Sequence, residues 1–201
     1  MPNEFANSDI SGHGTLYLPG GLALTVRPVA EADAGAVQGY FRALSAPSRY
    51  SRMLGAVSEL PPVELDRVVH GDIDHPSLLV TWVVEGREQI VAEARLAHDV
   101  AADTVEVSLS VDDRWQGRGL GRALFDHLQR RAARFGPVDL FGDTLRSNDA
   151  MIGLARRAGF ALIPTPGDWR LVRFHKRIDG GLPSADWHNA AATPRDPAIA
   201  P

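Results

Sequence analysis

A glycine-rich stretch past the middle of the chain has the composition of a phosphate-binding turn. It reads Gln-Gly-Arg-Gly-Leu-Gly-Arg over residues 116–122, between an alternating segment at residues 105–111 and an amphipathic segment that begins at Leu120. Such a turn from strand to helix lets backbone N–H groups converge on an anion at the positive end of the helix dipole. Arg118 and Arg122 add positive charge. The stretch therefore predicts a phosphate site.

The spacing of these glycines discriminates between two familiar phosphate-binding motifs. The P-loop requires a lysine directly after its last glycine, and no lysine follows here. The dinucleotide-binding fingerprint requires a third glycine three positions after the second, where this chain has Arg122. Asp143 nevertheless lies roughly where a ribose-binding acid would fall. The spacing argues against a P-loop and weakens a dinucleotide site, which stays open as an alternative.

The segment before the turn alternates in polarity with the period of a β-strand. The apolar residues at the odd positions of 105–111 face one side, and Glu106, Ser108 and Ser110 face the other. A solvated polar face would explain this pattern in an ordinary strand. Beside a phosphate site, the same face presents a carboxylate and two hydroxyls that could do chemistry.

The elements that must position these groups follow from periodicity and turn residues. Strands are expected at residues 15–18, 22–27, 78–84, 89–96, 105–111, 138–141 and 168–176. Helices are expected from about residue 31 to 44, around 50–54, and at 63–69, 120–135 and 148–158. Strands alternate with helices only in the second half of the chain. This order predicts an α/β fold with a mixed, mostly antiparallel, twisted sheet and helices on both faces.

Composition limits the class of protein. The 201 residues are 44% apolar and 23% charged, which suits one domain with a sizeable core. We expect that domain at residues 15–177, after a flexible N-terminus at 1–14 and before a disordered tail at 178–201, where Ala, Pro, Gly and Asp dominate and Trp187 is the exception.

Charge and cysteine content exclude several functions. The net charge of −4 argues against a nucleic-acid partner, and the absence of cysteine removes disulfides, thiolate metal sites and a cysteine nucleophile. No segment predicts a membrane span or a secretory signal, so the cytoplasm is the expected compartment. Residues 70–75 concentrate His and Asp, but they lack a recognised metal-ligand spacing, and we expect a solvated loop there and no metal site.

The glycine stretch and the segments around it resemble the GNAT superfamily of N-acetyltransferases. The resemblance runs from residues 24–28, a typical opening strand, through the Gln-x-x-Gly-x-Gly spacing of residues 116–121 to Asn148-Asp149-Ala150-Met151 and Arg156-Arg157-Ala158-Gly159-Phe160. It therefore covers most of residues 22–177. It implies the GNAT fold and the direct transfer of an acetyl group from acetyl-CoA to an amine.

The same resemblance implies where acetyl-CoA, the co-substrate, would bind. In the family, the central strand bulges and splays from the next strand, and the pantetheine arm lies in the gap. A backbone N–H near Leu109 to Val111 would polarise the thioester carbonyl. The residues implied in coenzyme binding are Leu109, Val111, Gln116, Gly117, Arg118, Gly119, Leu120, Gly121, Arg122 and Asn148. Asn148 would equally suit a helix N-cap.

The acid and base of the reaction are predicted with unequal support. An alkylamine has a pKa of about 10.4, so its acetylation needs a base, and several family members place a glutamate where this chain has Glu106. Glu93 and Asp99, on the neighbouring strand, are alternative bases. Many members have a tyrosine as general acid where this chain has Ala155. Ser147, Asn148 or water could protonate the thiolate, or it could leave unprotonated, since a thiol has a pKa of about 8.5.

The acceptor is predicted from the resemblance alone. Residues 48–52, 75–80 and 115–119 together resemble a bacterial protein-lysine acetyltransferase (Pat-like) subgroup, which favours a protein lysine. A small amine, a polyamine or an aminoglycoside is the alternative acceptor, and a non-catalytic acyl-CoA-binding module is the alternative to an enzyme. The sequence leaves the oligomeric state open, a homodimer included.

Overall fold

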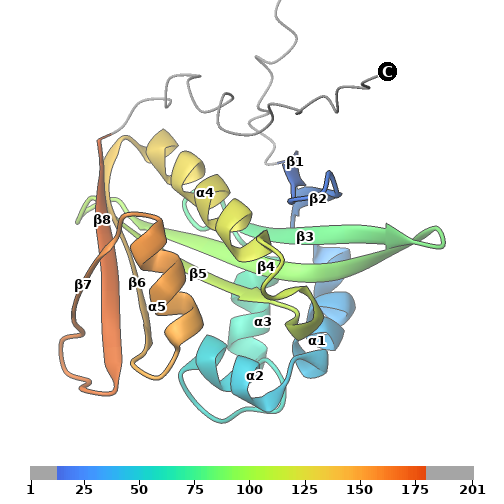
Figure 1. Ribbon diagram of the computed structural model, residues 1–201, viewed down its shortest axis with the longest axis horizontal. Coiled ribbons are helices and arrows are strands. Elements are labelled where there is room, and N and C mark those ends of the chain that lie inside the picture. The colour runs from blue at the N-terminus through green and yellow to red at the C-terminus, as the bar shows by residue number, and fades with distance from the viewer. Residues whose placement is uncertain (1–12, 180–201) are drawn as a thin grey trace, which may run out of the picture.

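The structure is a computed structural model and describes residues 13–179. Its centre is one twisted, eight-stranded sheet in the order β1-β2-β3-β4-β5-β6-β8-β7 (Figure 1). All neighbouring strands pair antiparallel except β5 and β6, which pair parallel. The strands are β1 (Gly14–Tyr17), β2 (Ala23–Pro28), β3 (Ser77–Val84), β4 (Arg87–Asp99), β5 (Thr104–Val111), β6 (Pro137–Leu145), β7 (Ala161–Pro164) and β8 (Leu171–Asp179).

Helices cover both faces of this sheet, as the sequence predicted. The α-helices are α1 (Ala34–Ala43), α2 (Ala46–Met53), α3 (Pro62–Val69), α4 (Leu120–Ala132) and α5 (Asp149–Arg157). The larger apolar core lies under α4 and α5, with Leu124, Phe125 and Phe174 fully buried. A second core on the opposite face joins α1 and α3 to Leu79 of β3. Among residues 13–179, no helix is long and apolar enough to cross a membrane.

The expected elements are present, but β4 and β6 extend beyond their predicted ends, to Asp99 and Leu145, and the C-terminal edge of the sheet differs. Strand β7 was not predicted; it is four residues long, mostly exposed and lacks apolar alternation, so its sequence carries no strand signal. Strand β8 begins at Leu171 and not at Asp168, because the Asp168 carboxylate accepts hydrogen bonds from the backbone N–H and side chain of Arg170 and closes a turn. Residues 1–12 and 180–201, including Trp187, lie outside the described residues.

The parallel pair β5 and β6 separates after three residues. The ladder joins Thr104–Glu106 to Asp139–Phe141 and then stops, although both strands continue. Gly142 follows directly, and a Cβ there would lie 2.3 Å from the Phe174 ring and 2.6 Å from the Val107 carbonyl oxygen. Only glycine fits this close approach. The predicted splay of the central strand is therefore present.

The predicted bulge lies on a different strand. The β4–β5 register is regular from Ala92 opposite Val111 to Asp99 opposite Thr104. The register shift instead occurs between β3 and β4, where Val80 pairs with Ala92 and Thr81 with Ile90, so that Val91 is the extra residue. The Val91 carbonyl accepts a hydrogen bond from the backbone N–H of Asp112, 2.9 Å away, just beyond β5.

A branched ion pair joins β2 to the turn before α1 and to β4. Arg27 of β2 donates to both carboxylate oxygens of Asp33 at 2.6 and 2.9 Å and to Glu88 of β4 at 2.8 and 3.0 Å. Arg27 and Asp33 are 19% and 15% exposed, so solvent screens this pair little. Hydrogen bonding to Arg27 lowers the pKa of Asp33 and of Glu88.

We predict that Arg27→Gln lowers the free energy of unfolding by about 1–3 kcal/mol near pH 7, because Asp33 then stays half-buried without its charged partner. A carboxyl group with a lowered pKa stabilises the fold above its unfolded pKa of about 3.9 and loses that effect as the pH falls through its folded value. The deficit should therefore shrink below about pH 4. Urea titrations of both proteins at several pH values measure it.

The control is Arg42→Gln, because the ion pair of Arg42 with Glu59 is exposed (60% and 53%). That variant should change stability by less than about 1 kcal/mol. A deficit in Arg27→Gln that is the same at neutral and acidic pH would contradict the assigned role of Asp33.

Candidate functional site

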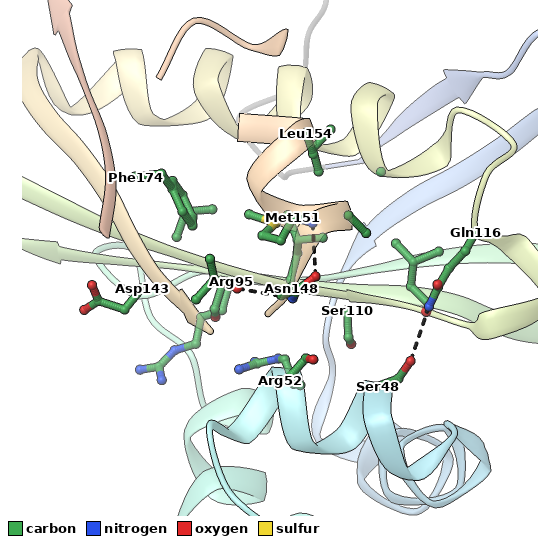
Figure 2. Close-up of a pocket in the computed structure, with 18 of the residues that line it drawn as sticks. Ser48, Arg52, Arg95, Ser110, Gln116, Asp143, Asn148, Met151, Leu154 and Phe174 are labelled. Atoms are coloured by element: carbon green, nitrogen blue, oxygen red, sulfur yellow. Dashed lines mark hydrogen bonds between the residues drawn. The ribbon is translucent and has the colours of Figure 1, made fainter. Parts of the chain in front are cut away.

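A groove of about 940 Å³ opens where β5 and β6 diverge. Its walls come from both layers of helices: α2 and α3 on one side of the sheet, and the start of α4 and one side of α5 on the other. Figure 2 shows Ser48 and Arg52 of α2 facing the sheet from below, Met151 and Leu154 of α5 from above, and Asn148, the N-cap of α5, at the level of the strands. The groove therefore passes through the plane of the sheet.

The exposed edge of β5 forms one wall of this groove. The Val107 carbonyl approaches β6 at Gly142, and the Val111 carbonyl accepts a hydrogen bond from the Gln116 side chain (3.1 Å), whereas the N–H of Asp112 points to β4. Because amide directions alternate along a strand, residues 107, 109 and 111 turn their backbone groups away from β4. Leu109 and Val111, two of the predicted coenzyme-binding residues, therefore present N–H groups to the groove.

The start of α4 supplies a second set of backbone donors. Gly119 is the N-cap of α4, with φ of 88°, and no side chain caps the helix. The first intrahelical donor is Ala123, which bonds to the Gly119 carbonyl at 3.0 Å. The preceding N–H groups of Leu120, Gly121 and Arg122 have no intrahelical acceptor. This arrangement suits an anion.

Two glycines and one glutamine shape the loop before α4. Gly117 and Gly119 both have left-handed φ values, 73° and 88°, and a Cβ on Gly119 would lie 3.1 Å from the ring of Pro19 in the β1–β2 turn. The Gln116 side chain donates to the Val111 carbonyl and to the Ser48 hydroxyl of α2, at 3.1 and 3.3 Å. Gln116 thus holds the loop against β5 and α2.

The structure brings most of the predicted coenzyme-binding residues together. The groove is lined by Leu109, Val111, Gln116, Gly117, Gly119, Gly121, Arg122 and Asn148. Two others do not line it. The Arg118 guanidinium stacks on the buried Trp115 ring, 5.5 Å from its centroid, and Leu120 is fully buried in the larger core. Arg122 lines the groove while paired with Asp126 at 2.8 Å.

Asn148 has the capping role that the sequence allowed. Its side-chain oxygen accepts a hydrogen bond from the backbone N–H of Met151 at 3.1 Å, and its amide donates to the Thr144 hydroxyl at 3.2 Å. It nevertheless lines the groove, whereas Ser147 is exposed and does not. Ala155 is fully buried and offers no acid.

The three carboxylates proposed as bases differ in position. Glu106 is exposed and lines the groove. Glu93 is 5% exposed and bonds to Arg52 at 3.1 and 3.2 Å, and Asp99 accepts hydrogen bonds from Ala101 and Ala102 at the far end of β4. Neither Glu93 nor Asp99 lines the groove. Glu106 is thus the accessible one.

Two further carboxylates line the groove, and both are engaged. Glu64 pairs with Arg67 at 2.5 Å, and Asp143 pairs with Arg173 at 2.7 Å. Among the lining carboxylates that the structure describes, Glu106 alone has no ion pair. It is therefore the carboxylate best able to accept a proton from a ligand.

A buried polar cluster under the groove was not predicted. Tyr40 of α1 bonds to the Ser110 hydroxyl at 3.1 Å, and Ser110 lies 3.5 Å from the Glu93 carboxylate that Arg52 neutralises. Burial raises the pKa of Tyr40 far above its ordinary value, so this phenol keeps its proton. The contacts join α1, α2, β4 and β5, and no local sequence signal could show them.

The histidines of the predicted loop pair separately with aspartates. His70 contacts Asp66 at 2.9 Å, His75 contacts Asp72 at 2.8 Å, and the neighbouring His98 contacts Asp74 at 3.4 Å. Within residues 13–179, no three His, Asp or Glu side chains gather in a way that could hold a metal ion.

Comparisons with known proteins agree with this geometry. Residues 78–162 match the family model of the acetyltransferase (GNAT) domain. An acetyltransferase of Pseudomonas aeruginosa, PA5475, is 29% identical over 157 residues, which cover 78% of this chain and 84% of that protein.

Solved structures confirm the predicted GNAT fold. The GNAT domain of S. lividans PAT superposes with a TM-score of 0.75 at 24% identity, over 85% of this chain and 99% of that one. A phosphinothricin acetyltransferase from Sinorhizobium meliloti, solved in complex with acetyl-CoA, gives a TM-score of 0.58 at 18% identity, over 78% of this chain and 89% of that one.

We predict that Gly119→Val weakens binding of coenzyme A at least about tenfold, because a branched side chain in the left-handed region is strained and would crowd Pro19 and the start of α4. Calorimetric titration with coenzyme A measures the affinity.

The matched control is Gly86→Val in the β3–β4 turn. Gly86 has φ of 75°, and a Cβ added there would have no atom within 4 Å. It does not line the groove. It should lose stability to backbone strain, by about 1–3 kcal/mol, yet bind coenzyme A normally. Unchanged affinity in Gly119→Val would remove the start of α4 from the binding site.

Proposed function

We propose that this chain, which matches the family model of the acetyltransferase (GNAT) domain over residues 78–162, is an N-acetyltransferase that moves acetyl from acetyl-CoA to an amine. One observation supports this most: the groove between β5 and β6 joins two sets of backbone donors to an unpaired carboxylate, Glu106. The donors suit an acylated, phosphate-bearing ligand, and the carboxylate suits an amine.

The residues present fit acetyl-CoA. The N–H groups at the start of α4 would hold its diphosphate, since a helix N-terminus favours negative charge. The unpaired edge of β5 would bind the amides of the pantetheine arm as an added strand does. When bound, acetyl-CoA supplies a thioester carbonyl, to which the N–H of Leu109 or Val111 would donate a hydrogen bond.

Glu106 would act on the acceptor. A protonated amine cannot attack a carbonyl, and Glu106 would take its proton directly or through one water. The free amine then forms the new C–N bond as the C–S bond breaks and the thiolate leaves, and the second proton of the nitrogen is lost to water. Since the chain has no cysteine to carry the acetyl group, direct transfer is the simpler route.

The leaving thiolate would not need a dedicated acid. Ala155 stands where many family members have a tyrosine, and it cannot donate a proton. A thiol has a pKa of about 8.5, so the thiolate is a tolerable leaving group near neutral pH. Water that reaches the open groove can protonate it afterwards.

The acceptor would enter from the side that α2 and α3 line, opposite the start of α4. A protein lysine is the acceptor that the Pat-like resemblance favours, and a small amine is the alternative. Thiol release from acetyl-CoA, measured against a panel of lysine peptides, polyamines, aminoglycosides and amino acids, distinguishes them. Tight binding of acetyl-CoA without turnover on any amine would indicate a non-catalytic module, and a larger thermal shift with NAD than with CoA esters would indicate a dinucleotide-binding protein.

We predict that Glu106→Gln lowers kcat/KM by about 10²–10⁴-fold near pH 7 and leaves the affinity for acetyl-CoA unchanged. The defect should narrow above about pH 9, because an amine with a pKa of about 10.4 increasingly loses its proton to water. The pH profiles of kcat/KM for the two proteins measure this.

Glu59→Gln serves as the control of equal charge, because Glu59 is exposed and pairs with Arg42 outside the groove. Its profile should match that of the wild type. If Glu106→Gln kept full activity from pH 6 to 10, Glu106 could not be the base.

A further inference from the structure

We propose that the acceptor carries a carboxylate near its reactive amine, and that Arg95 binds this carboxylate. The inference rests on the proposed function and narrows its acceptor class. Arg95 lies on β4, lines the groove and faces the same side of the sheet as Glu106. Its side chain is half-buried.

The Arg95 guanidinium lacks a partner where one is needed. Its Nε is buried and without a hydrogen bond, and within residues 13–179 the side chain forms no ion pair. Each guanidinium N–H that has lost water without gaining an acceptor, as the Nε–H of Arg95 has, costs free energy of the order of the hydrogen bonds it forgoes. A ligand oxygen in the groove would restore those bonds.

The other arginines that line the groove are either paired with a carboxylate or lie on the opposite side of the sheet. Arg52 pairs with Glu93, Arg67 with Glu64, and Arg122 with Asp126. Arg157 forms no ion pair with any residue that the structure describes, but it is exposed and lies on α5, on the opposite side of the sheet. Figure 2 shows Arg95 extending on the side of the sheet that α2 covers, as Arg52 does. Arg95 is thus the half-buried cation available on the acceptor side.

The neighbours of Arg95 indicate a zwitterion. Arg95 pairs with Ser108 and the next residue on that face, Ala97, pairs with Glu106, so Arg95 and Glu106 are diagonal neighbours. Such neighbours have Cβ atoms about 7–8 Å apart or less, within reach of two long side chains. An ammonium at Glu106 and a carboxylate at Arg95 would place both charges of one acceptor.

The charge balance favours a carboxylate over a phosphate. The groove offers one unpaired guanidinium here, and Glu64, Glu106 and Asp143 also line it. A singly charged, planar carboxylate matches the guanidinium fork with two hydrogen bonds. A doubly charged phosphate would leave one charge uncompensated near these acids. The carboxylate can belong to a free amino acid or to an Asp or Glu beside a lysine in a polypeptide.

The test compares matched acceptors in two arms. One arm measures acetyl transfer to free amino acids and to their amides, and the other to lysine peptides with Glu or with Gln next to the lysine. In at least one arm, the carboxylate form should have a kcat/KM at least about tenfold higher. Arg95→Gln should abolish this preference, and Arg95→Lys should retain part of it. The arm that shows the preference identifies the source of the carboxylate.

A binding measurement keeps the test independent of turnover. The products are N-acetylated amino acids with their amides, and acetyl-lysine peptides with Glu or Gln beside the lysine. Titrated in the presence of coenzyme A, the two members of at least one set should differ in affinity at least about tenfold on the wild type and should bind Arg95→Gln with similar affinities. Arg42→Gln, which removes the same charge outside the groove, should behave as the wild type. Such binding without any acetyl transfer would refute the proposed function and not the inference.

Two results would overturn the inference. The first is acetyl transfer that is indifferent to the carboxylate in both arms, which would leave the proposed function intact. The second is a carboxylate preference, in transfer or in binding, that survives in Arg95→Gln.

Discussion

The unpaired edge of β5 is the constraint on which the site depends. A strand in the middle of a sheet normally pairs on both sides, because buried N–H and C=O groups need partners. Here β5 keeps its full ladder with β4 but loses β6 after Glu106. Apart from the Val111 carbonyl, which accepts a hydrogen bond from Gln116, the backbone groups of residues 107, 109 and 111 are therefore available, and an extended ligand can pair with them in place of a strand.

The surrounding packing keeps this gap open. Gly142 and the buried Phe174 ring occupy the point where β5 and β6 part, and the two strands diverge from there. The β1–β2 turn supports the loop before α4 through Pro19, and Gln116 ties the same loop to β5 and α2. Since cores on both faces hold these elements, the groove is a product of the whole fold.

The charged residues of the groove differ in whether they form ion pairs. Most of the charged side chains on its acceptor side neutralise one another, as Arg52 does for Glu93 and Arg173 for Asp143. Paired groups have little free energy to gain from a ligand, because a new contact replaces an existing one. Among the described residues, Glu106 and Arg95 are the exceptions. Their opposite charges lie on neighbouring strands and would orient an acceptor that carries both an ammonium and a carboxylate.

Local features could be predicted from the sequence alone. The glycine-rich turn, the alternation of β5 and the Asn148 cap all depend on residues close together in the chain, so their types and spacing revealed them. The fold class followed from the order of these elements. Where the local sequence signal is weak, the prediction was wrong: the short exposed strand β7 was missed, and β8 was predicted to start too early.

Only the tertiary structure decided which charges meet. Arg52 is 41 residues from Glu93, and Tyr40 is 70 residues from Ser110, so their contacts depend on how α1 and α2 pack on the sheet. The sequence could list Glu93, Asp99 and Glu106 as bases but could not rank them by burial. It could not single out Arg95 either, because the absence of a partner is a property of the packed neighbourhood and not of the residue.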